Sequence, residues 1–229
     1  MLVRNSRTSG SSLNRADKSF VKSMRIAFGF KAHSGWAALV VVSQVDGVWS
    51  VVDRRRVELV EADQLWAKQP YHAAEELPPA QARKVVTSGI EHAQRIALRE
   101  LKTLVKWAEA GGHSVAGCGV LVGERMPAWS VDEILAVHFR MHKAEGVLFR
   151  DVLAQAAKEC GLRVLQIPEK SLLQEATSSL GSSADKLAAL LTTLGKSVGA
   201  PWGKDQKEAT IAAMMALSPA KKYSRTQKA

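Results

Sequence analysis

Three strand-like segments between residues 25 and 60 constrain the fold of this chain more than any other feature. Their sequences are RIAFGF, WAALVVVSQV and VWSVVDRRRVELV, with short turn-forming stretches between them. Asp46-Gly47, between the second and third segments, favours the two-residue turn of a β-hairpin. The segments therefore predict a meander of three antiparallel strands. With strict alternation, one face of the third strand would carry Trp49, Val51, Asp53 and Arg55.

Beyond residue 79, helical patterns alternate with short apolar runs. Apolar residues recur at steps of three and four from Ala80 to about Ala110, where Gly111-Gly112 ends the helix. The next run, SVAGCGVLVGER, is continuously apolar and bounded by glycines, which is typical of a strand buried on both faces. Ser130 and Glu133 predict a capping box at the start of a helix that extends to about Glu159.

The last part of the chain supplies a fifth strand and the closing helices. LRVLQIP predicts the strand, and helices are expected after Pro168, from Ala184 to about Leu194 and from Asp205 to Leu217. The order is therefore β-β-β-α-β-α-β-α, and helices between the later strands imply parallel, right-handed crossovers. The sequence predicts an α/β fold whose mixed five-stranded sheet, three antiparallel strands and then two parallel ones, is flanked by helices.

This order resembles the ribonuclease-H-like fold, and five stretches between residues 25 and 218 resemble RuvC-type Holliday-junction resolvases. The resemblance implies DNA or RNA as the partner, and a homodimer as a possible assembly. The matching stretches are Gly29-Phe30-Lys31 with Ser34-Gly35-Trp36, VLVGE (120–124), AEGVLF (144–149), AKECGLRVLQIPEKSL (157–172) and Asp205-Gln206-Lys207-Glu208-Ala209.

The same resemblance implies a nuclease site with four acidic positions. Such enzymes use two Mg²⁺ ions about 3.5–4 Å apart, and Mg²⁺ or Mn²⁺ takes carboxylate oxygens as ligands. Three of the positions match Glu124, Asp205 and Glu208, which would be the ligands if a metal binds. Asp205 and Glu208, at i and i+3, share one side of a helix. Carboxylates are also common at strand ends and helix N-termini for electrostatic reasons alone.

The fourth position holds Lys31, which departs from the family pattern. An ammonium group cannot bind Mg²⁺, and we expect it to pair with Glu124 or Asp205 and to fill the space of a metal. The simplest interpretation is a nucleic-acid-associated protein whose two-metal site is altered or lost, which leaves enzymatic activity open. The alternatives are an active metal-dependent endonuclease with a shifted ligand set and an interaction module that keeps only the fold.

A second candidate site lies on the predicted helix after Ser130. His138, His142 and Glu145 stand at i, i+4 and i+7 on one face, and histidines at i and i+4 suit zinc. With His33 or His72 from loops, they could form a metal or acid/base site. We favour the simpler explanation that both histidines line an interface of an amphipathic helix.

The basic residues are candidates for phosphate contacts. Arg54, Arg55 and Arg56 on the third strand could bind phosphate or protect a sheet edge from aggregation, and we prefer the edge role. Lys204 and Lys207 flank the acidic positions of the last helix and are further candidates for nucleic-acid binding.

Most of the net charge of +10 lies at the two ends of the chain. Residues 1–24 hold five Lys/Arg and one Asp, and residues 219–229 hold four Lys/Arg and no acid, so the body carries only +2. We predict basic, disordered ends around one domain at residues 25–218. The ends could contact phosphates or simply keep the chain soluble.

Compartment and cysteine chemistry follow from what the sequence lacks. No apolar run approaches the ~20 residues that span a bilayer, and the N-terminus lacks the apolar stretch of a signal peptide. We therefore expect a cytoplasmic protein with no membrane segment. Cys118 and Cys160 are predicted to be packing residues rather than a disulfide or a zinc site.

Overall fold

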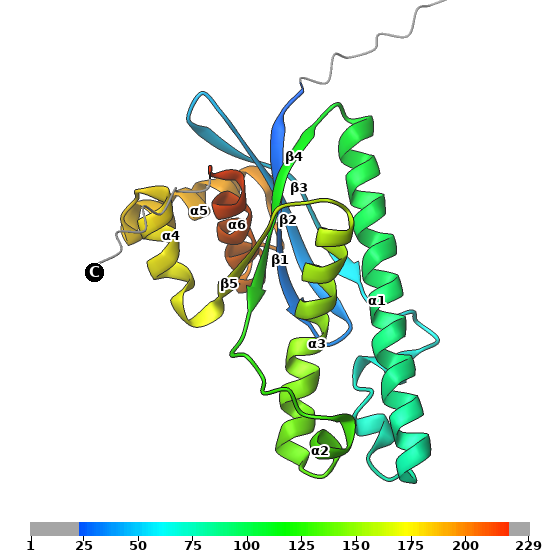
Figure 1. Ribbon diagram of the computed structural model, residues 1–229. Coiled ribbons are helices and arrows are strands. Elements are labelled where there is room, and N and C mark those ends of the chain that lie inside the picture. The colour runs from blue at the N-terminus through cyan, green and yellow to red at the C-terminus, as the bar shows by residue number, and fades with distance from the viewer. Residues whose placement is uncertain (1–22, 220–229) are drawn as a thin grey trace, which may run out of the picture.

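The computed structural model describes residues 23–219, and its centre is one mixed β-sheet (Figure 1). The strands are β1 (Arg25–His33), β2 (Trp36–Val45), β3 (Val48–Glu58), β4 (Ser114–Val122) and β5 (Val164–Pro168), in the spatial order β3-β2-β1-β4-β5. The pairs β1–β2 and β2–β3 are antiparallel, and the pairs β1–β4 and β4–β5 are parallel. This is the arrangement of the ribonuclease-H-like fold, as predicted.

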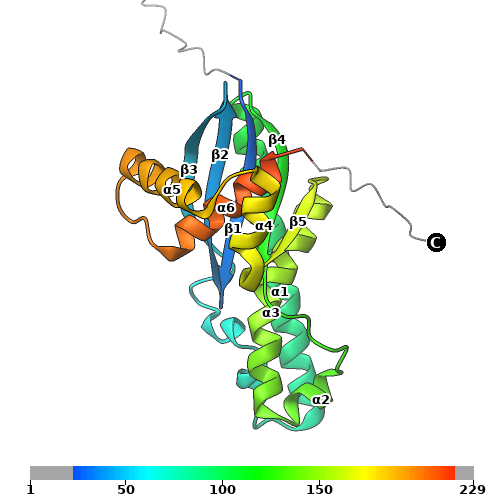
Figure 2. The ribbon, with the colours of Figure 1, turned by 90° about the vertical axis from the view of Figure 1, so that its left-hand side faces the viewer.

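Helices cover both faces of the sheet. Their bounds are α1 (Pro79–Ala110), α2 (Val131–Leu135), α3 (His138–Glu159), α4 (Leu172–Leu180), α5 (Ala184–Val198) and α6 (Lys204–Leu217), with short 3-10 turns η1 (Leu65–Lys68), η2 (His72–Ala74) and η3 (Glu169–Ser171). α1 and α3 pack on one face (Figure 1), and α4, α5 and α6 lie on the other, in front of the sheet in Figure 2. Within residues 23–219, no helix has the length and apolar character to cross a membrane.

α1 and α3 continue beyond the edge of the sheet and form a helical extension with α2 and residues 61–78 (Figure 1). This extension has a small apolar core of its own: Tyr71, Ala74, Ala82, Val86, Ile134, Met141 and Ala144. Because few apolar side chains stabilise the extension, its polar contacts also matter for how residues 61–78 are held against the helices.

The helix predicted from Ser130 to Glu159 is interrupted, and this prediction is wrong in that respect. Val137 is extended, with φ −141° and ψ 111°, and separates α2 from α3. The Arg140 side chain donates to the carbonyl oxygen of Glu133 at 2.8 Å and satisfies an acceptor in the last turn of α2. The break lets α2 bury Ile134 in the core of the extension.

The predicted capping box at the start of α2 is confirmed. The Ser130 hydroxyl accepts from the Glu133 amide at 3.2 Å, and the Glu133 carboxylate accepts from the Ser130 amide at 2.8 Å. Ser130→Ala should therefore lower the free energy of unfolding by about 1 kcal/mol, measured by urea denaturation. Thr103→Ala, on the exposed side of α1, is the control and should cost nothing, because alanine is the better helix former. Equal losses in both variants would contradict the capping role.

The predicted alternation along the third strand is wrong beyond Val51. A bulge adds a residue to β3 where Val41 and Val42 of β2 pair with Asp53 and Val51. The extra residue, Val52, shifts the pattern by one position. As a result Trp49 and Val51 pack on the α6 face, whereas the Arg55 guanidinium lies 5.3 Å from the ring of Trp107 in α1, on the opposite face.

Two further predictions from the sequence concern the ends of the chain and its cysteines. The predicted disorder of the two basic ends concerns mainly residues 1–22 and 220–229, which lie outside the described part of the chain.

Cys118 and Cys160 are both free thiols, and burial raises the pKa of each. The thiols therefore act as packing groups, as expected.

Candidate functional site

Lys31 lies on the central strand and binds two carboxylates. Side chains of β1 alternate between the two cores, so Lys31 and His33 share the α6 face with Ala27. The Lys31 ammonium lies 2.5 Å from Oε2 of Glu169 and 3.0 Å from Oε2 of Glu208, and the lysine side chain is only 8 % exposed. The Lys31 ammonium therefore links Glu169, which follows β5, to Glu208 in α6.

Arg150 of α3 adds a second cation to this group. Its Nη2 atom donates to Oε1 of Glu169 at 2.8 Å. The guanidinium passes the end of β4, where a Cβ on Gly123 would clash with Nη1 of Arg150. Lys204, which is 81 % exposed, also lies 3.8 Å from Oε1 of Glu208. Both carboxylates are thus compensated by cations, which is the condition under which buried ionic groups are tolerated.

Asp205 takes part in a different chain of contacts. Its carboxylate accepts from Nε2 of His33 at 2.9 Å, and the His33 ring stacks on Trp36 with centroids 4.3 Å apart. The Arg56 guanidinium lies 3.9 Å from the Trp36 ring, in contact by a cation–π interaction. His33, predicted as a secondary candidate, therefore lies beside the first turn of α6.

Glu124 follows β4 and points into solvent. Its side chain is 65 % exposed and forms an ion pair with Lys170. The hydrogen bond from Lys170, then the charges of Lys170 and Lys143, lower the pKa of Glu124 below its usual value. In the part of the chain that the structure describes, no hydrogen bond or ion pair joins Glu124 to Asp205 or Glu208.

The residues at this position do not fit a pair of Mg²⁺ ions. Within residues 23–219, no three carboxylates bring their oxygens within 4.8 Å of one another. The two carboxylates that do converge, Glu169 and Glu208, are already bound to the Lys31 ammonium. A metal ion there would have to displace a nearly buried cation, so this group supports no metal-dependent step.

The three predicted arginines have separate partners. Arg54 donates to the carbonyl oxygens of Val198 and Ala200, at 3.0 and 2.7 Å, and also to that of Pro201, so it anchors the loop between α5 and α6. Arg55 pairs with Asp53, and Arg56 pairs with Glu58. All three lie on β3, an edge strand of the sheet. Lys204 and Lys207 are exposed on the first turn of α6.

The histidines of the second candidate group converge in the helical extension. His138 and His142 of α3 lie with His72 of η2, and each offers a ring nitrogen within 4.8 Å of the others. Glu145 is 4 % exposed and binds His72 rather than adding a fourth ligand, since its Oε2 lies 2.7 Å from Nδ1 of that ring. His33 lies at the sheet instead.

No protein-family model matches the chain, and no curated protein matches it. Similar solved structures include RuvC of Thermus thermophilus, with a TM-score of 0.44 and 13 % identity over 83 % of this chain and 92 % of that one. Another is T. thermophilus RuvC in complex with a Holliday junction substrate, with a TM-score of 0.42 and 12 % identity over 83 % and 91 %.

Sequence reasoning missed Glu169 and Arg150 as site residues. Glu169 directly follows Pro168, the last residue of β5, and the carboxyl ends of parallel strands meet at one edge of a sheet. The position of Glu169 directly after a predicted strand could therefore have identified it as a site residue. Arg150 gave no such signal, because it reaches the site from the middle of a long helix on the other face.

Proposed function

We propose that this chain is a nucleic-acid-binding protein of ribonuclease-H-like fold that does not cut its ligand. The observation that carries the proposal is the Lys31 ammonium, 2.5 and 3.0 Å from the carboxylates of Glu169 and Glu208. The ammonium supplies the positive charge that a metal would bring to these carboxylates, but it has no open coordination position. It can neither activate a water molecule nor polarise a phosphate in the way that a metal does.

The groups around this site support a nucleic-acid ligand. Lys204 and Lys207 are exposed beside it, and Arg56 lies over the Trp36 ring at the same end of the sheet. Lysines and arginines neutralise phosphates. The two basic ends add a net charge of +8 to a body of +2, which strengthens binding to any polyanion.

Binding is tested by fluorescence anisotropy of the full chain with a four-way DNA junction, linear duplex DNA and RNA over a range of salt. We expect binding at low salt that weakens as salt rises. The variant Lys204→Glu/Lys207→Glu should flatten the dependence of log K on log[salt] by about 0.9 for each phosphate that the protein no longer neutralises. The matched control is Lys84→Glu/Lys102→Glu, which changes the same charge on exposed positions of α1.

One result would overturn the proposal, and another would overturn the binding surface assigned to it. If the wild type binds none of the nucleic acids at low salt, the chain is an interaction module that shares only the fold. If the two double variants bind equally well, the first turn of α6 does not contact phosphates, and attraction by net charge accounts for binding.

A further inference from the structure

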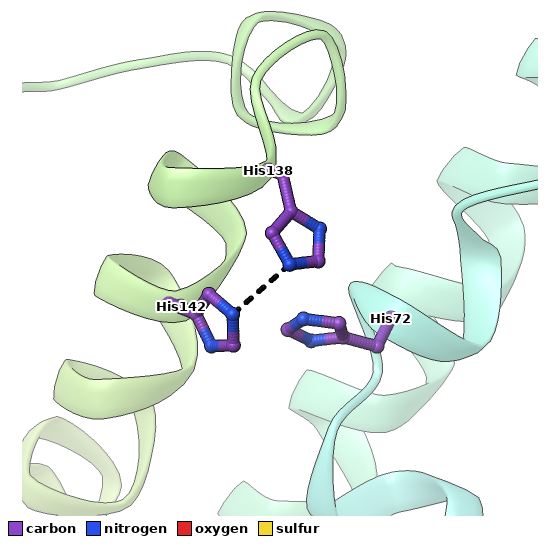
Figure 3. A group of neighbouring side chains, drawn as sticks. All are labelled: His72, His138 and His142. Carbon is purple, nitrogen blue, oxygen red and sulfur yellow. Dashed lines mark hydrogen bonds between the residues drawn. The ribbon is translucent and has the colours of Figure 1, made fainter.

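We propose that His72, His138 and His142 form a binding site for Zn²⁺ in the helical extension, separate from the ionic group at the sheet. The three rings come from two elements, η2 and the first two turns of α3, and point toward one another (Figure 3). One nitrogen of each lies within 4.8 Å of the other two. Three convergent imidazoles are the protein ligands of one common type of zinc site.

The spacing of the nitrogens is close to that of a bound metal. The Nε2 atoms of His138 and His142 are 3.1 Å apart. In a tetrahedral site with Zn–N bonds of about 2.0 Å, two ligand nitrogens lie about 3.3 Å apart. The helical spacing i, i+4 therefore already holds two ligands at the required separation, and only His72 has to be supplied from elsewhere.

His72 is oriented so that one nitrogen is free to bind a metal. Its Nδ1 atom lies 2.7 Å from Oε2 of Glu145, while its Nε2 atom is buried and has no hydrogen-bond partner among the described residues. Oε1 of Glu145 accepts from the amides of Tyr71 and His72, each at 3.1 Å. A carboxylate held in this way takes the Nδ1 proton of His72 as a hydrogen bond and leaves the lone pair on Nε2.

His138 repeats the arrangement of His72, because its Nδ1 atom lies 3.0 Å from Oε1 of Glu75. Two of the three imidazoles thus have the carboxylate partner that metal-binding histidines usually have. Both pairs also join residues 61–78 to α3, which agrees with the interface role that the sequence favoured, but that role gives no partner to the buried Nε2 atom of His72.

The set of donors selects the metal. Three neutral imidazoles suit zinc and related transition ions, whereas Mg²⁺ and Ca²⁺ take oxygen ligands. His138 is 60 % exposed, so the fourth position faces solvent and would hold water or an external ligand. A bound ion would fasten residues 61–78 to the start of α3, where Val137 provides no side-chain cap.

The test is a Zn²⁺ titration of tag-free, chelator-treated full-length protein by calorimetry, with Co²⁺ absorption as a report on geometry. We expect one equivalent of Zn²⁺, tetrahedral Co²⁺ absorption and a higher melting temperature with metal. His142→Ala should lower the affinity by more than about 100-fold, because removing even an outer partner costs about 10–100-fold. His113→Gln, at the opposite end of α1, is the control and should bind as the wild type does.

A second pair of variants keeps the test valid if His142→Ala does not fold. Glu75→Gln removes the partner of His138 from an exposed position and should lower the affinity about 10-fold. Glu76→Gln changes the same charge on the next residue, which is also exposed, and should have no effect. No stoichiometric Zn²⁺ binding by the wild type would overturn the proposal, and so would equal losses in the paired variants.

Discussion

Lys31→Asp is expected to make the stability of this protein depend on Mg²⁺. Without metal, the substitution removes both ion pairs of Lys31 and adds a third carboxylate beside Glu169 and Glu208. Breaking a buried ionic group in this way costs about 3–5 kcal/mol. With Mg²⁺ at 100 times its dissociation constant, binding to the folded state should restore about 2.7 kcal/mol. Urea denaturation with and without Mg²⁺, together with calorimetry, measures both effects.

Lys31→Met is the matched control for this prediction. It removes the same positive charge and a side chain of similar length, but it supplies no ligand for a metal. We expect a comparable loss of stability that Mg²⁺ does not restore. If Lys31→Asp gains no affinity for Mg²⁺ over the wild type, the three groups do not converge as described, and the assignment of Lys31 to the metal position fails.

Gly29→Val is expected to have the largest effect on stability outside the ionic group. A Cβ on Gly29 would overlap the carbonyl oxygen of Ala209 and would lie 2.6 Å from the amide nitrogen of Ala213. Both atoms belong to the backbone of α6 and cannot turn aside. The loss should be about 3 kcal/mol or more, at the upper end for overpacking, and the displaced helix would carry Glu208 away from Lys31.

The control for Gly29→Val is Gly146→Ala in α3. A Cβ on Gly146 meets no atom within 4 Å, and the residue lies inside a helix. This substitution should raise the free energy of unfolding by up to about 1 kcal/mol, because alanine favours the helix. Denaturation curves should show a lower free energy of unfolding for Gly29→Val and a higher one for Gly146→Ala than for the wild type. A tolerated valine at position 29 would show that α6 does not pack against the sheet as closely as the structure indicates.

The sequence predicted the sheet because its signals are local. Asp46-Gly47 adopts the left-handed turn expected of a hairpin, with φ 51° and 79°, and the helices after residue 79 force the later strands to run parallel. The departures are confined to single residues, which no periodic pattern reveals. They are the bulge at Val52 and the extended backbone of Val137.

The candidate sites were predictable only where spacing along one element fixed the geometry. His138 and His142 were found together because i and i+4 share a helix face, but nothing in the sequence favoured His72 over His33 as their third partner. The ion pairs of Lys31 show the same limit. Glu124 and Asp205 were the expected partners of the lysine, and that expectation was wrong. Lys31 instead binds Glu208, one helical turn after Asp205, and Glu169, which follows β5.

The most direct test of the central claim is a crystal of the wild-type protein soaked in Mn²⁺, with anomalous diffraction recorded at the sheet. We predict no anomalous peak between Glu169 and Glu208, and density for the Lys31 ammonium in contact with both carboxylates. A Mn²⁺ peak at that position, with the lysine side chain turned away, would contradict the claim that an ammonium has replaced the metal.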